Sequence, residues 1–265
     1  MKKVKIIMYN NIGAYPEAAM EDGISPDAFA HDMAYLADNG YHVVPLAEAL
    51  ELAESGKPIP DKLLSLTFDG GFSDAYDNVF PVLRKHGFPA TFLVSLPDVG
   101  KSLTVYGEPI PCMGWEEIRE IAEAGFEVGA YLLSWRAYHP HLEADIINAI
   151  RDAAAAFPDL LGKALRYVSV REGIPGKAVM EALKEVGIEA FLTKCPTKRR
   201  PHRYVIGRIQ IDDNDPNIFF IKISRNYLRF KDSRSWPYLR KYKIDRLAHL
   251  ISDTVNARRA RKAGD

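Results

Sequence analysis

Short apolar runs rich in β-branched residues alternate with segments of helical periodicity along most of the chain, and this alternation limits the fold more than any other feature. Repeated strand–helix units predict a mostly parallel sheet, either open or closed into a barrel. The expected strands cover residues 4–9, 41–44, 63–68, 90–95, 126–133, 165–170, 190–193, 205–211 and 218–223. Helices are expected between Ser25 and Gly40 and over residues 46–55, 74–86, 115–124, 143–156 and 177–186.

One α/β domain over residues 1–235 accounts for this pattern, followed by a basic helical extension over residues 236–265. From residue 222 to the end, 13 basic side chains face 4 acidic ones, and aromatic residues are interleaved with them. Such a tail favours docking on an anionic surface, either a membrane or a glycan. A solvated helix face would give the same pattern.

The charge and the cysteines narrow the class of protein. The 35 basic and 35 acidic side chains cancel, which argues against a nucleic-acid-binding protein. Cys112 and Cys195 are too few for a disulfide framework or a four-cysteine zinc site, so we expect ordinary thiols. Neither a leader-like apolar run at the N-terminus nor a stretch of roughly 20 apolar residues is present, so the expected location is the cytoplasm.

The expected site lies where the parallel strands end. In α/β folds the catalytic residues come from the carboxyl ends of the strands and from the loops that follow. This rule selects Asn10 and Asn11, the pair Asp69-Gly70, residues 131–135, and Arg166.

These segments carry a resemblance to a known family. The run Leu66-Thr67-Phe68-Asp69-Gly70-Gly71 resembles the T-F-D-D-G motif of the polysaccharide deacetylases, the NodB-homology domain or carbohydrate esterase family 4. Residues 8–13, 80–83, 87–92 and 125–129 resemble strings of the branch that deacetylates poly-N-acetylglucosamine, and the similarity covers about residues 4–221. The resemblance implies an irregular (β/α)-barrel.

The resemblance also implies a metal-assisted hydrolysis that this sequence is poorly equipped to perform. In the family one aspartate is the base, while a second aspartate and two histidines hold a divalent ion that activates water. Asp69 retains the base position, but Gly70 replaces the metal aspartate, and Tyr131 and Trp135 replace the histidines. Tryptophan cannot ligate a metal and a neutral tyrosine is a poor ligand, so no metal and no other cofactor are expected.

Two further family positions leave alternatives open. A short insertion would shift the register so that His139, in His139-Pro140-His141-Leu142, becomes a metal ligand. The arginine that orients the family's catalytic aspartate corresponds to Arg166, so its pairing with Asp69 is expected, although an ion pair that only ties two strands together is an equal alternative. The last expected strand contains no histidine to serve as general acid.

The sequence therefore predicts a carbohydrate-binding or regulatory pseudoenzyme whose ligand is an acetylated glycan or sugar. Tyr131 and Trp135 would stack on sugar rings, with Asn10 and Asn11 beside them, unless the two aromatic rings only fill the vacated space. The alternative is an active hydrolase that removes acetyl groups with Asp69 as base, Arg166 as its partner and no metal.

Overall fold

The computed structural model describes residues 4–14, 22–105, 107–132, 142–171, 173–194, 204–212 and 214–224. Trp135, His139, His141, Cys195 and the basic extension from residue 236 lie outside these ranges. The chain divides into two compact units, Met1–Asn214 and Asp215–Asp265, so the division falls before the expected domain boundary at 235.

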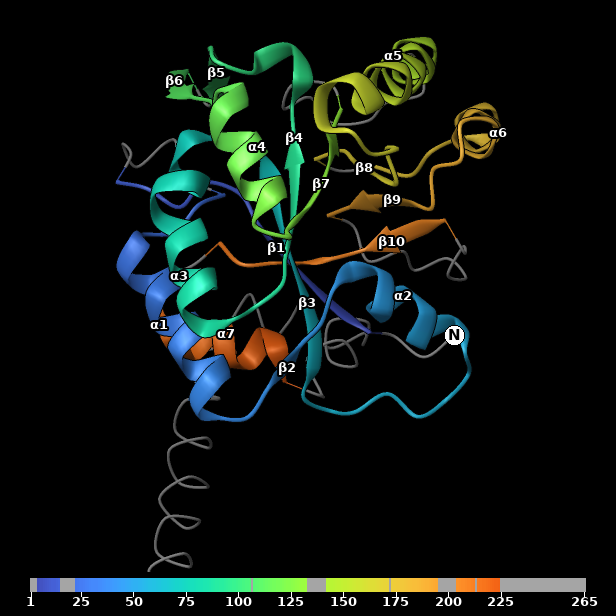
Figure 1. The fold of residues 1–265 in the computed structure, drawn as a ribbon. Helices are drawn as coiled ribbons and strands as arrows, with labels where there is room; N and C mark the ends of the chain where they lie inside the picture. The colour runs from blue at the N-terminus through green and yellow to red at the C-terminus, as the bar shows by residue number, and fades with distance from the viewer. Residues whose placement is uncertain are drawn as a thin grey trace, which may run out of the picture. The chain divides into compact units, whose positions relative to one another are not determined.

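The first unit is built on a parallel sheet to which nine strands of the described ranges contribute, in the order β10-β9-β8-β7-β4-β3-β1-β11 with β2 beside β3 (Figure 1). The outermost strands of this order follow each other directly in the chain, so the sheet forms a nearly closed barrel of the expected class. The strands are β1 (Lys5–Tyr9), β2 (His42–Val43), β3 (Leu63–Gly70), β4 (Thr91–Val94), β7 (Glu127–Tyr131), β8 (Tyr167–Ser169), β9 (Ala190–Thr193), β10 (Val205–Gly207) and β11 (Ile209–Gln210).

Helices connect the strands as the sequence periodicity predicts. Those of the first unit are α1 (Pro26–Asp38), α2 (Leu46–Glu54), α3 (Phe80–His86), α4 (Trp115–Glu123), α5 (Glu143–Leu161) and α6 (Lys177–Glu185). The Ser25 hydroxyl accepts a hydrogen bond from the Ala28 amide and caps α1, whose first residue is Pro26. A π-helical segment, Ala75–Val79, leads into α3. Within the described ranges, no helix combines the length and the hydrophobicity needed to cross a membrane.

Three elements differ from the sequence prediction. Residues 218–223 were expected to form a strand, but they belong to helix α7 (Pro216–Ile223) of the second unit. A short apolar run has no periodicity that separates strand from helix, and Pro216 fits a first helical turn. The expected strand over 205–211 is divided at Arg208 into β10 and β11, and the hairpin of β5 (Ser102–Val105) and β6 (Glu108–Pro111) was not expected.

The two faces of the sheet are packed differently. On the outer face Phe68 stacks on Tyr9 and Phe92 and meets Phe29 of α1 edge to face. Side chains alternate between the two faces of a strand, so the intervening residues point to the interior. Among them are Leu93, Tyr131, Tyr167 and Leu192, which pack together with Leu46 of α2. Both faces are therefore buried, and all eight residues of β3 are buried, including Ser65, Thr67 and Asp69 on the interior face.

Gly129 is required by close packing between strands. A Cβ atom at this position would lie 2.6 Å from the carbonyl oxygen of Tyr167 and 2.7 Å from a methyl group of Leu93. We expect Gly129→Ala to lower the free energy of unfolding by about 1–3 kcal/mol, measured by urea denaturation. Gly114→Ala is the control, because its Cβ would meet only Glu117 at 3.8 Å, and an equal loss in both variants would contradict this reason.

Candidate functional site

Asp69 forms a buried ion pair inside the barrel with Arg208. The Nη1 and Nη2 atoms of Arg208 lie 2.6 Å from Oδ1 and Oδ2 of Asp69, so the contact is bidentate, and neither side chain is exposed. Nη1 of Arg208 also donates to the hydroxyl of Thr67 at 3.2 Å. That hydroxyl donates in turn to the carbonyl of Ile7 on β1 at 2.8 Å. Burial raises the pKa of the Asp69 carboxyl, and the Arg208 guanidinium opposes that rise.

The fold brings Arg208 to Asp69 because the chain changes strand neighbours at Arg208. β10 pairs with β9, and β11 pairs with β1, while the Arg208 amide donates to the carbonyl of Thr193 at the end of β9. Asp69 is one residue from the carboxyl end of β3. The strand register therefore places both residues at the carboxyl-terminal part of the barrel, where the site was expected.

Tyr131 ends β7 and closes one side of this interior. Its side chain is 2% exposed and belongs to the apolar interior cluster. Burial raises the pKa of the Tyr131 phenol well above its ordinary value, and the charge of Asp69 adds to the rise. The phenol is therefore neutral at physiological pH. Its ring has almost no solvent-exposed face, so it does not offer the open platform for sugar stacking that the sequence suggested.

A second polar group, the Asp22 cluster, lies beside this pair. It consists of Asp22, Arg171, Lys194 and Gln210. Nη2 of Arg171 and Nζ of Lys194 each lie 2.9 Å from the Asp22 carboxylate, and Nε2 of Gln210 donates to it at 2.7 Å. Asp22 is buried, whereas the side chains of Arg171 and Lys194 are 24% and 32% exposed. Arg171 lies two residues after β8 and Lys194 directly after β9, so their partly exposed cations stand at the carboxyl-terminal mouth of the barrel.

Asn10 and Asn11 follow β1 at the same edge and are both buried. Nδ2 of Asn10 donates to the carbonyl of Asp22 at 3.2 Å, and the carbonyl of Asn11 accepts from the amide of Ile24 at 3.0 Å. These contacts hold the loop that carries Asp22 against the barrel. Among the expected site residues, the structure thus gathers Asp69, Tyr131, Asn10 and Asn11 at one edge, while Trp135 lies outside the described ranges.

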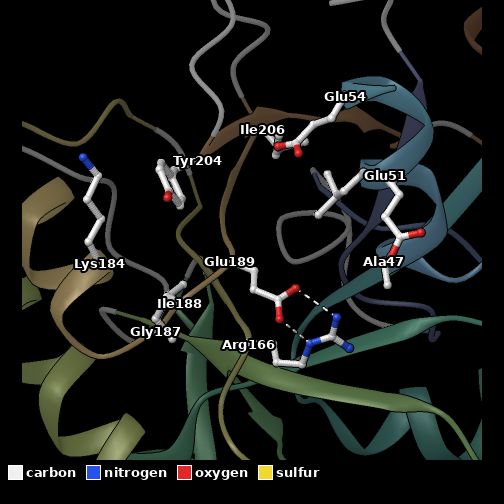
Figure 2. A pocket seen from close by; sticks show the side chains of 11 residues that line it. Ala47, Glu51, Glu54, Arg166, Lys184, Gly187, Ile188, Glu189, Tyr204 and Ile206 are labelled. Carbon is white, nitrogen blue, oxygen red and sulfur yellow. Dashed lines mark hydrogen bonds and ion pairs between the residues drawn. The ribbon is translucent and has the colours of Figure 1, made fainter. Parts of the chain in front are cut away.

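The expected pairing of Arg166 with Asp69 is wrong. Arg166 precedes β8, and its Nε and Nη2 atoms donate to Glu189 at 2.7 and 2.9 Å (Figure 2). It also lies 3.5 Å from Glu127 and its guanidinium covers the ring of Tyr167. Glu127, Arg166 and Glu189 lie at the amino ends of β7, β8 and β9, away from the carboxyl end of β3 that carries Asp69. Arg166 thus matches the alternative reading, an ion pair that ties neighbouring strands together.

Arg166 and Glu189 line a separate pocket of about 350 Å³ at this amino-terminal edge. Glu51 and Glu54 of α2 form another wall, and Lys184 stands over the ring of Tyr204 (Figure 2). This pocket does not include Asp69 or any member of the Asp22 cluster.

Sequence reasoning missed Arg208 and the Asp22 cluster. Arg208 interrupts the apolar run 205–211, and a charged residue inside a buried strand must have a partner, so its position carried a usable signal. Asp22 carried none, because its partners Arg171, Lys194 and Gln210 are 149 to 188 residues away in the sequence.

The described residues at this edge, which exclude 133–141, do not fit the metal ion of the family chemistry. Gly70 has a φ of +100°, and a Cβ atom there would overlap the ring of Phe72, so the position has no room for a ligand side chain. The neighbouring carboxylate, Asp69, is already occupied by the Arg208 cation. No cluster of three His, Cys, Asp or Glu side chains able to hold a metal occurs in the part of the chain that the structure describes.

Comparison with known proteins relates this chain to deacetylases. The family described as Polysaccharide deacetylase matches residues 56–191, more than half of the chain. YxkH of Bacillus subtilis, itself classed among the polysaccharide deacetylases, is 23% identical over 217 residues, 79% of this chain and 71% of that protein. The poly-beta-1,6-N-acetyl-D-glucosamine N-deacetylase of Escherichia coli is 32% identical over 108 residues, which cover 38% of this chain and only 16% of that enzyme.

The solved structure of IcaB from Ammonifex degensii has the same fold. It superposes with a TM-score of 0.70 at 23% sequence identity, covering 83% of this chain and 97% of that one. The fold, the match over residues 56–191 and the aspartate at the carboxyl end of β3 agree with one another, and the chain belongs to the polysaccharide deacetylase family.

Proposed function

We propose that this protein is a carbohydrate-binding or regulatory pseudoenzyme of the polysaccharide deacetylase family. The observation that carries the proposal is the state of Asp69: both carboxylate oxygens accept from Arg208, and the side chain has no exposed surface. A general base must reach the proton that it removes, directly or through one water. An arginine partner alone does not exclude a base, but a carboxylate with both oxygens bonded and no exposed surface cannot reach a substrate or its water.

The closed environment of Gly70 and Tyr131 supports the same proposal. Phe72 fills the space that a side chain at position 70 would need, and the Tyr131 phenol is buried and neutral. Phe72 and Tyr131 fill the interior around position 70 and leave no place for a metal-bound water. They also argue against the alternative, a hydrolase that uses Asp69 without a metal.

Ligand binding falls instead to the partly exposed mouth of the barrel. The family acts on acetylated polysaccharides, and the Asp22 cluster presents charged and amide groups of the kind that bind sugars. The Oε1 atom of Gln210 is buried and has no hydrogen-bond partner among the described residues. A buried acceptor without a partner is costly, and a sugar hydroxyl donating to it would remove that cost.

The test is to measure binding and hydrolysis side by side on the full chain. We expect oligomers of N-acetylglucosamine, β-1,4- and β-1,6-linked, to bind in isothermal titration calorimetry while no acetate is released, with or without added zinc, cobalt or nickel. Metal-dependent release of acetate would overturn the proposal. Metal-independent release that is lost in Asp69→Asn would establish the alternative hydrolase, and release that persists in that variant would exclude Asp69 as its base.

A further inference from the structure

The pocket at the amino-terminal edge of the barrel, here called the Arg166 pocket, has walls that the backbone holds in place. The amide of Glu189 donates to the carbonyl of Arg166 at 2.8 Å, and the amide of Phe191 donates to the carbonyl of Tyr204 at 2.6 Å. These hydrogen bonds tie the starts of β8, β9 and β10 together, so the pocket is formed before any ligand arrives. Its volume of about 350 Å³ lies in the range of roughly 300–1,000 Å³ that small-molecule sites occupy.

The floor of the Arg166 pocket is apolar. Leu50 of α2 and Ile206 of β10 are partly buried and pack against the interior cluster of the barrel. They line the pocket together with Ala47 and Ile188. A ligand with an apolar face gains free energy when it covers this surface and removes it from water.

Hydrogen-bond donors stand around this floor. Arg166 has five N–H donors, of which two bond to Glu189 and a third lies 3.5 Å from Glu127. The other two have no partner in the part of the chain that the structure describes. The described contact of the Lys184 ammonium is with the ring of Tyr204, 5.5 Å away, which leaves its three N–H groups for a ligand.

Carboxylates supply the acceptors. Figure 2 shows Glu51 of α2 and Lys184 of α6 on opposite sides of the pocket, and no described side chain bonds to the Glu51 carboxylate. Arg166 and Glu189 neutralise each other as an ion pair. Glu54 lines the pocket too but has a further interaction, so it is not counted as a free acceptor. The other four side chains offer donors and acceptors without an excess of either charge.

We propose that the Arg166 pocket binds one uncharged pyranose unit of a glycan. A pyranose has apolar C–H faces and a rim of hydroxyls, each of which both donates and accepts hydrogen bonds. One face of the sugar covers the apolar floor, while its hydroxyls accept from Arg166 and Lys184 and donate to Glu51. The inference rests on the proposed carbohydrate binding and adds to it a second site, at the opposite end of the strands from Asp69.

Methyl NMR spectroscopy locates the site directly. The probe is the β-1,6-linked trimer of N-acetylglucosamine, added to the full chain labelled with carbon-13 at the isoleucine δ-methyl groups. We expect the signals of Ile188 and Ile206 to shift as the trimer is added, because both side chains line the pocket. Ile118 of α4 and Ile150 of α5 are buried away from the pocket lining, and their signals should stay in place.

Variants of the lining should weaken the binding that these methyl shifts report. Glu51→Ala and Lys184→Ala change exposed helical positions, and each should weaken it about tenfold through the loss of a charged hydrogen-bond partner. Ala47→Trp fills the pocket and should abolish it. The matched controls are Glu48→Ala on α2 and Lys177→Ala on α6, which are exposed and do not line the pocket, so they should bind like the unchanged protein. Thermal unfolding shows whether each variant is folded.

The outcomes distinguish this pocket from the proposed function. Trimer binding in calorimetry without shifts at Ile188 and Ile206, or with equal affinity in all folded variants, would overturn the pocket and leave carbohydrate binding intact. Shifts that are lost in Ala47→Trp, together with metal-dependent release of acetate, would support the pocket and overturn the pseudoenzyme. Absence of binding by both methods would overturn both.

The fully deacetylated trimer, which carries ammonium groups, tests the class of ligand. We expect it to bind no more tightly than the acetylated trimer, because the four counted side chains have no net charge. Tighter binding of the deacetylated trimer that weakens as NaCl is added would overturn the uncharged class.

Discussion

Arg208→Met is expected to lower the free energy of unfolding by about 3–5 kcal/mol, because it leaves the Asp69 carboxylate buried without its partner. In contrast, the double variant Asp69→Leu/Arg208→Met removes both charges and should recover most of the loss. The measurement is urea denaturation of the unchanged protein, the single variant and the double variant. Arg151→Met is the control: Arg151 pairs with Glu185 on the surface, with 51% and 61% of the two side chains exposed, so its loss should be under about 1 kcal/mol.

The loss in Arg208→Met should depend on pH in a defined direction. Burial raises the pKa of Asp69, and removing the guanidinium leaves that rise unopposed. When the pKa of a carboxyl is higher in the folded than in the unfolded protein, the folded state holds the proton to higher pH. The free energy of unfolding therefore falls as the pH rises from the unfolded pKa to the folded pKa, and it stays low above them. The deficit should therefore be smaller at pH 5 than at pH 8. A deficit that is independent of pH, or that grows as the pH falls, would show that the charge of Asp69 is not its cause.

The barrel could be predicted from the sequence because its signal is local and repeated. Each strand–helix unit carries its own periodicity, and the Ser25-Pro26 start of α1 is a local capping signal that the structure confirms. The errors arose where local pattern is ambiguous. Residues 218–223 are apolar except for Lys222, so the spacing of their apolar residues does not separate helix from strand, and β5 and β6 are short.

The site could be predicted only in part, because its location follows from topology but its pairings do not. The carboxyl ends of the strands gave Asp69, Tyr131, Asn10 and Asn11. Arg208, the partner of Asp69, is 139 residues away in the sequence. Its position depends on where the chain stops pairing with β9 and begins pairing with β1, which no local pattern specifies. The family's sequence pattern offered Arg166 as one of two equal readings, but Glu127 and Glu189 hold it at the other end of the strands.

Gly70→Ala is expected to destabilise the protein by about 2–4 kcal/mol, for two reasons that can be separated. A φ of +100° is unfavourable for any residue with a Cβ atom, and that atom would overlap the ring of Phe72. Gly87→Ala is the matched control, because Gly87 has a φ of +64° and nothing within 4 Å of its Cβ position, so only the backbone term applies. Urea denaturation should show a clearly larger loss at Gly70, and equal losses would mean that Phe72 moves aside freely.

The same crowding decides whether the family's metal site can be rebuilt. Replacing Gly70 with Asp, and Tyr131 and Trp135 with His, restores the ligand types of the direct alignment, but a carboxylate at position 70 has no room beside Phe72. We therefore expect the triple variant to hold no zinc in a competition titration with a fluorescent chelator. Adding Phe72→Ala opens the space, and only this quadruple variant should gain zinc affinity, provided that circular dichroism shows a folded barrel. Tight binding of one zinc by the triple variant would contradict the crowding at Gly70, whereas failure of a folded quadruple variant would favour the shifted register in which His139 is the ligand.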